Sequence, residues 1–265
     1  MQPNVKIARD LRAAVMSALD VSLRPTGLAE KPKLKPKQAA GVPGAVIHRT
    51  IENPIRGETI ERVLEGGIAV LFATGPGLTE EVVATVLKAR HRKKLYLFGC
   101  NDAYKILPTL DVHYACDAGW WNIHYQDLHE YPLTHGMWTQ EPKLSKNKYP
   151  KLRRIAGCSG NGLSVAQDLI HFGNNSGYQL INLALLFGIK RFILCGYDMS
   201  VHSGKRHFFG DHPPGLNKSG NYSGFVPMFD TIKSAALGIE ILNTTPKSAL
   251  KAFPKMDLEE ALNLE

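Results

Sequence analysis

The sequence predicts an α/β protein with a Rossmann-like, mostly parallel sheet, helices on both faces and a basic N-terminal extension. Short apolar runs alternate with amphipathic segments from residue 68 onward, which is the pattern of repeated strand–helix units. The runs 68–73 and 191–195 are almost continuously apolar, as expected of strands that are covered on both faces. Glycine or polar residues follow these runs, where a parallel sheet turns into its next helix.

The individual elements follow from caps, breakers and apolar spacing. Thr79 is placed to cap a helix over 80–88, and Gly188 ends a helix that begins at Asn175 or Ser176. The other expected elements are helices over 58–64, 103–107, 226–237 and 258–262, and strands over 94–98, 112–116, 152–156 and 239–242.

Residues 1–56 are expected to form a separate basic region before a nucleotide-binding domain over 57–265. They hold ten Lys or Arg against four Asp or Glu, which is +6 of the net charge of +8. The spacing over 4–19 predicts an amphipathic helix, whose apolar stripe needs the core or a second copy of the chain as its partner. Alternating Lys and Pro over 31–37 predict an extended linker. A basic arm is typical of nucleic-acid contact, although a solvated extension has the same composition.

The sequence contains no signal for export or membrane insertion. No apolar run reaches the roughly 18 residues that span a bilayer, and the N-terminus lacks a signal-peptide core. We therefore expect a cytoplasmic protein with no membrane span. The cysteines have no CxxC spacing, and three of them at the ends of apolar runs are expected to be buried free thiols: Cys100, Cys116 and Cys195.

The turn after the first strand is a candidate phosphate site. Its sequence is Thr74-Gly75-Pro76-Gly77, and glycines leave backbone N–H groups uncovered at the positive end of the helix that follows. The turn matches neither GxGxxG nor a Walker loop. An ordinary strand-to-helix turn with Gly and Pro as breakers explains it equally well.

Polar residues also follow three later strands and begin one helix. Because open α/β sheets bind ligands beyond the carboxyl ends of their strands, we expect these residues to contact a nucleotide, although Asn and Asp are also common turn residues. They are Asn101, Asp102, Asp117, Ser176, Gly177, Gly196 and Asp198. Adjacent tryptophans are not expected to face the core together in a helix, which leaves Trp120 or Trp121 to stack on a base or sugar.

The candidate catalytic groups lie in a Gly/Pro-rich segment, 205–215. It holds His207, Asp211 and His212. Histidine is the side chain whose ordinary pKa suits proton transfer near neutral pH. A neighbouring carboxylate such as that of Asp211 would raise the pKa of the histidine and orient its ring. The same three side chains are an alternative metal site, but their spacing does not match a common ligand pattern, so no metal centre is predicted.

Together these segments resemble the bacterial sialyltransferases that use CMP-sugar donors. The resemblance covers about residues 68–250 and rests on short motifs in the same order. Residues 73–78 are similar to the family's G-N-G-P-S-L turn, and 100–101 to its C-N motif. Residues 175–177 are similar to its T-S-G motif, and 196–198 to its G-x-D motif. Residues 207–212 are similar to its H-Y-x-G-H-S loop, with one residue inserted.

The resemblance implies a transferase with a nucleotide or nucleotide-sugar donor. His212 would be the general base, with His207 as the second choice. The wider superfamily also includes 6-hydroxymethylpterin pyrophosphokinases and uncharacterised, often phage-encoded, proteins.

Three functions remain open at this point. The first is a glycosyltransferase-like enzyme that transfers a group from the donor to a hydroxyl of a glycan or a nucleic acid. The second is an ATP- and Mg²⁺-dependent pyrophosphokinase or nucleotide transferase, in which Asp102, Asp117 and Asp198 would hold the metal. The third is a non-enzymatic protein that binds nucleic acid through residues 1–56.

Overall fold

The protein folds around a seven-stranded sheet in which every pair of neighbouring strands is parallel, as predicted. The computed structural model describes residues 57–212, 216 and 221–264, so the basic region 1–56 lies outside the described residues. The strands in spatial order are β5 (Leu152–Arg154), β4 (Met137–Thr139), β3 (Val112–Tyr114), β2 (Leu95–Cys100), β1 (Ile68–Phe72), β8 (Arg191–Cys195) and β9 (Glu240–Asn243). The strand order reverses between β1 and β8, which makes this gap the topological switch point.

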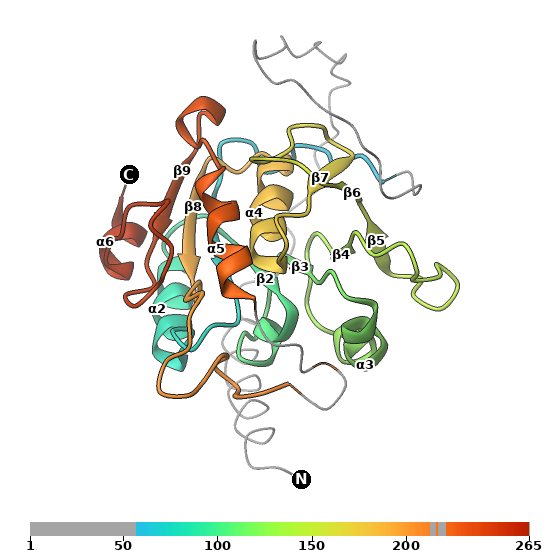
Figure 1. The fold of residues 1–265 in the computed structure, drawn as a ribbon, viewed down its shortest axis with the longest axis horizontal. Coiled ribbons are helices and arrows are strands. Elements are labelled where there is room, and N and C mark those ends of the chain that lie inside the picture. The colour runs from blue at the N-terminus through green and yellow to red at the C-terminus, as the bar shows by residue number, and fades with distance from the viewer. Residues whose placement is uncertain (1–56, 213–215, 217–220, 265) are drawn as a thin grey trace. The chain divides into compact units, whose positions relative to one another are not determined.

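Helices cover both faces of the sheet, which confirms the predicted layers (Figure 1). Alternate residues of β1 serve the two cores: Ala69 and Leu71 belong to one, and Val70 and Phe72 to the other. Because both faces are buried, the strand shows no alternation of polar and apolar residues. The first face is covered by α4 (Ser176–Leu186) and α5 (Tyr222–Asp230), and the second by α2 (Glu80–Arg90), α3 (Ala118–Leu128) and α6 (Leu258–Asn263).

Helix α4 is the central helix of its layer, and each of its residues is buried. The side chain of Asn175 accepts a hydrogen bond from the Tyr178 amide at 2.9 Å, which caps the helix as predicted. Gly188 follows the helix with φ of 98°, a left-handed conformation that suits glycine.

The predicted helix over 58–64 is wrong. The amide of Glu58 donates to the Arg154 carbonyl, and that of Ile60 donates to the Gln167 carbonyl, both at 2.7 Å. The Leu64 amide donates to the Phe187 carbonyl at 2.9 Å, so the segment bonds to three distant parts of the chain and lacks the regular ladder of a helix. Ile60 and Leu64 are still buried, at 2% and 3% exposure, so their apolar spacing reflects the core without a helix.

Other elements differ from their predictions in extent. The strand expected over 152–156 divides into β5 and β6 (Ala156–Cys158), and β6 pairs with β7 (Leu169–His171) in a second, two-stranded sheet. The helix expected over 226–237 divides into α5 and a 3₁₀ helix, η2 (Ala235–Leu237). The short helix expected over 103–107 is a 3₁₀ helix, η1 (Asn101–Lys105), which begins directly at the end of β2.

Both adjacent tryptophans are buried, so the prediction that one stacks on a ligand is wrong. Trp120 and Trp121 are 3% and 0% exposed. The Trp121 indole donates to the Ala115 carbonyl and the Trp120 indole to Asp102, each at 2.9 Å. Both rings pack against His113 of β3, with centroids 5.1 and 5.7 Å away, and Trp120 also packs against Tyr104 of η1 at 6.0 Å. Cys100 and Cys195 are buried free thiols as predicted, whereas Cys116 is only partly buried.

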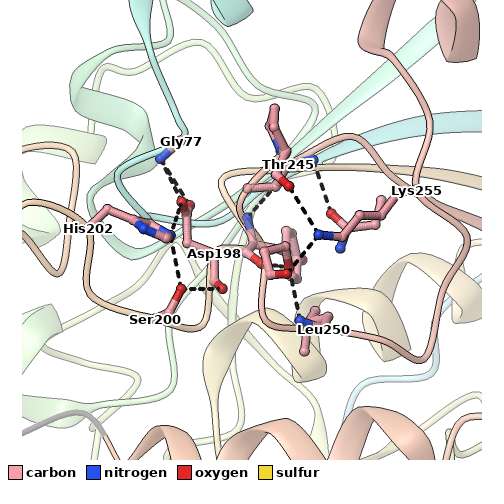
Figure 2. A network of polar contacts seen from close by, with 11 residues as sticks. Gly77, Asp198, Ser200, His202, Thr245, Leu250 and Lys255 are labelled. Carbon is pink, nitrogen blue, oxygen red and sulfur yellow. Dashed lines mark hydrogen bonds and ion pairs between the residues drawn. The ribbon is translucent and has the colours of Figure 1, made fainter.

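The turn after β1 is held against the end of β8. The Gly75 amide donates to the Gly196 carbonyl at 2.9 Å, and the Gly77 amide lies 3.0 Å from both carboxylate oxygens of Asp198 (Figure 2). On its other side, the Tyr197 amide donates to the Thr245 hydroxyl at 3.0 Å. These bonds fix the switch point from both sides.

Within the described residues, no helix combines the length and apolar character needed to cross a membrane.

Gly75→Ala should destabilise the protein, because a Cβ at this position would lie 2.1 Å from Asp198 Oδ2 and 2.6 Å from the Gly196 oxygen. We expect the free energy of unfolding to fall by about 1–3 kcal/mol, as for other overpacked sites, in denaturant titrations. Gly119→Ala is the control: Gly119 is exposed in α3, and among the described residues its Cβ would meet only the Leu216 side chain, at 3.2 Å. An equal loss in both variants would contradict the steric explanation.

Candidate functional site

The carboxyl ends of β1, β2, β3 and β8 bring the predicted site residues to one edge of the sheet. Helix α4 runs back from this edge, so its first residue lies there too. The Ser176 hydroxyl is 3.3 Å from Asn101 Oδ1 and 3.1 Å from the Cys116 sulfur, which joins α4 to the ends of β2 and β3. Asp117 directly follows Cys116 and is exposed. These residues thus form a polar rim next to the switch point.

The segment 199–212, here named the histidine loop, docks onto the turn after β1. The Phe208 amide donates to the Thr74 carbonyl at 3.0 Å, and the Thr74 hydroxyl is 3.1 Å from His207 Nδ1. The rings of His207 and His212 have centroids 4.6 Å apart. His212 Nδ1 lies 3.9 Å from an oxygen of Asp102 at the end of β2. Both predicted catalytic histidines therefore lie at the same edge as the rim residues, whereas Asp211 is exposed.

The two glycine amides of the turn after β1 already donate within the protein. Gly75 and Gly77 donate to Gly196 and Asp198, and Pro76 has no amide hydrogen. Burial raises the pKa of Asp198, against the Gly77 amide and the nearby His202, which lower it. In this arrangement the turn positions the histidine loop through Thr74, and its glycine amides do not face a free phosphate site.

The three predicted carboxylates have three different environments. Asp198 is 2% exposed and holds the Gly77 amide. Asp102 is fully buried, with an ion pair to Lys105 and a hydrogen bond from Trp120. Asp117 is exposed and accepts only a long contact of 3.4 Å from the Cys116 thiol. Asp117 is therefore the one of these three that faces solvent.

Both histidines are neutral near pH 7. Burial lowers the pKa of His207 to about 4, and the neighbouring His212 lowers it further than Asp102 raises it. Burial also lowers the pKa of His212, as do Lys105 and His124, whereas the carboxylates of Asp102 and Asp117 raise it. A neutral imidazole is the form that accepts a proton.

Left-handed backbone conformations occur around this edge in residues other than glycine. Asn101, Asn174 and Met199 have φ of 47°, 62° and 50°, and they lie after β2, before α4 and after Asp198. Asn adopts this conformation more readily than most residues, but a Met in it is uncommon. Such strain is concentrated at functional sites, which supports this edge as the site.

The sequence interpretation missed two side chains of the site. Lys105 pairs with Asp102, and the His124 ring lies 3.8 Å from the same carboxylate. The spacing of three residues between Asp102 and Lys105 was a usable signal, because η1 places them on one face. His124 had no such signal, since only the packing of α3 on η1 brings it near.

Neither a second hollow nor a metal centre offers an alternative site among the described residues. A hollow of about 390 Å³ lies at the opposite, amino edge of the sheet, and its lining includes Gly66, Lys190 and Glu240 but none of the predicted site residues. In the part of the chain that the structure describes, no three His, Cys, Asp or Glu side chains are grouped as metal ligands.

Comparison with known proteins adds no functional assignment. No family model matches the sequence, and a search of curated proteins finds no match.

Stability should fall as the pH is lowered from about 6.5 to about 4. Burial lowers the pKa of His113 and His207 from 6.5 to about 4, so in this range the unfolded chain binds more protons than the folded one. We expect the melting temperature to fall across this range, and to fall less steeply in His207→Gln. The difference between the two proteins isolates His207, because the opposite contribution of Asp198 is common to both. An identical slope would contradict the depressed pKa.

Proposed function

We propose that this protein is a transferase that moves a group, by its family resemblance a sugar, from a nucleotide-activated donor to a hydroxyl acceptor. The observation that carries the proposal is the docking of the histidine loop onto Thr74. It places His207 and His212 beside the rim formed by Asn101 and Ser176. Crevices at the switch point of open α/β sheets are where such folds bind nucleotides.

The donor phosphate fits best at the start of α4. The first amides of a helix have no carbonyl partner within it, and the helix dipole favours an anion there. Ser176 and Gly177 lie at this position, and the Ser176 hydroxyl also reaches Asn101. Asn101 and the exposed Asp117 would then contact the nucleoside, with Asn offering both a donor and an acceptor.

His212 supplies the base in this mechanism. The acceptor oxygen forms a bond to the transferred carbon as the bond from that carbon to the donor phosphate breaks. The phosphate oxygen leaves with the electron pair, and the acceptor proton moves to the His212 ring. His207 positions the loop, because its Nδ1 is engaged with Thr74.

Asp102 and Asp198 make the Mg²⁺-dependent alternative less favourable. Both are buried and already paired with protein donors, and only Asp117 remains open for a metal. The acceptor class, glycan or nucleic acid, remains a prediction, as does the role of residues 1–56.

His212→Ala should lower turnover by about 10²–10⁴-fold while donor binding persists, because a general base contributes about this much. Donors are first selected from a panel of nucleotides and nucleotide-sugars by their effect on the melting temperature, since a ligand of the folded state raises it. Transfer is then measured with the donor that binds. His129→Ala, an exposed histidine after α3, is the control and should keep full turnover. Unchanged turnover in His212→Ala would remove the mechanism.

EDTA should leave transfer unchanged. This result is expected because two of the three carboxylates at the edge are engaged by the protein itself. Complete loss in EDTA, with recovery on adding Mg²⁺, would instead favour the pyrophosphokinase alternative.

A further inference from the structure

A fully buried carboxylate, that of Asp102, lies beneath the histidine loop. It is 0% exposed, accepts a hydrogen bond from Trp120 at 2.9 Å and forms an ion pair with Lys105. A buried charge costs several kcal/mol unless it is paired. Burial alone would raise the pKa of Asp102, but Lys105, Trp120 and His124 outweigh burial, and the pKa lies below its usual value. The carboxylate is therefore ionised in the folded protein.

Two imidazoles face this carboxylate, one toward each oxygen. His124 Nε2 is 3.8 Å from Oδ1, and His212 Nδ1 is 3.9 Å from Oδ2. Both nitrogens are buried, and neither has a hydrogen-bond partner among the described residues. A buried polar atom without a partner costs about 1–3 kcal/mol. The contacts exceed hydrogen-bond length, about 3.2 Å, by less than 1 Å, and hydrogen bonds at catalytic groups often tighten only when the ligand is bound.

We propose that Asp102 is a positioning residue for His212 and not a contact to the nucleotide. Its carboxylate accepts a hydrogen bond from His212 Nδ1–H. This leaves the lone pair of Nε2 on the side of the ring away from Asp102, where it takes the acceptor proton. The inference rests on the proposed role of His212 as the base.

The burial of the two residues supports this assignment. Asp102 has no exposed surface with which to reach a nucleotide, whereas the His212 side chain keeps 16% of its surface exposed although its Nδ1 is buried. The exposed part of the ring is therefore the part away from Asp102. When the ring becomes an imidazolium, the adjacent carboxylate stabilises it.

The charges around His212 come from several elements. Asp102 and Lys105 face it from η1. His124 faces it from α3, Asp117 from the position just before α3, and His207 from the histidine loop. Asp102 raises the pKa of His212 and Lys105 opposes it, but burial makes the net shift downward. The resting imidazole therefore stays neutral although the carboxylate lies beside its Nδ1.

The test uses the full chain with ¹⁵N-labelled histidine and needs no substrate. NMR reports which ring nitrogen of His212 carries the proton and at which pH the ring titrates, with the His212 signal assigned by its loss in His212→Gln. We expect the Nδ1–H form in the natural protein. In Asp102→Asn this preference should be lost and the pKa of His212 should fall, since the carboxylate that favours the imidazolium is gone. Neither effect follows from a purely structural role.

Asp111→Asn is the matched control. Asp111 is also buried, at 3% exposure, and accepts hydrogen bonds from Arg90 and the Leu97 amide. It directly precedes β3, so it lies at the amino end of that strand, away from His212. Its loss removes a buried carboxylate but should leave the His212 tautomer and titration unchanged. An Nε2–H form in the natural protein would overturn the proposal, even if Asp102→Asn does not fold. A His212 titration unaffected by Asp102→Asn would overturn it as well.

The transfer assay separates this inference from the proposed function. If both are correct, Asp102→Asn lowers turnover by about 10²-fold or more and leaves donor affinity unchanged. If His212→Ala keeps full turnover while NMR shows the Nδ1–H form held by Asp102, the transferase mechanism fails and the positioning contact stands. The reverse pattern, loss of turnover in His212→Ala without any effect of Asp102, overturns only the inference.

Discussion

The hydrogen bonds between the turn after β1 and the end of β8 are the constraint on which the site depends. Two amides of one turn, those of Gly75 and Gly77, are bonded to Gly196 and Asp198 across the switch point. A side chain at Gly75 would collide with these acceptors. Thr74 belongs to the same turn and contacts His207 and Phe208. The hydrogen bonds that join the turn to the end of β8 therefore also set the position of the histidine loop.

Three aspartates that each follow a strand have acquired different roles from their surroundings. Asp198 is buried against an amide and has a raised pKa, while Asp102 is buried against a lysine and has a lowered one. Asp117 is exposed at the end of β3. The same residue type after three strands thus has three environments. Asp198 accepts a backbone hydrogen bond, Asp102 is ionised beside two imidazoles, and Asp117 faces solvent. Burial and the charge of the nearest donor decide among these roles.

His212 is neutral at rest although a carboxylate lies beside its ring. Burial disfavours the charged form of His212, and Lys105, which pairs with Asp102, opposes the effect of that carboxylate. In the proposed mechanism, the carboxylate beside the ring lowers the energy of the imidazolium that forms during proton transfer. His207 has a similar ring and a depressed pKa, but its contact with Thr74 assigns it to holding the loop.

The sequence by itself determined every strand of the main sheet except β4, the order of the main units and the edge at which polar residues gather. The apolar runs of β1 and β8 and the capped helix α4 are local features, so spacing and caps suffice to predict them. Only the tertiary structure decided that 58–64 is not a helix, that both Trp120 and Trp121 are buried, and that His124 lies near Asp102. Gly77 and Asp198 are 121 residues apart in sequence. No local pattern encodes such a partner, because a side chain's role in the core is set by whichever segment packs against it.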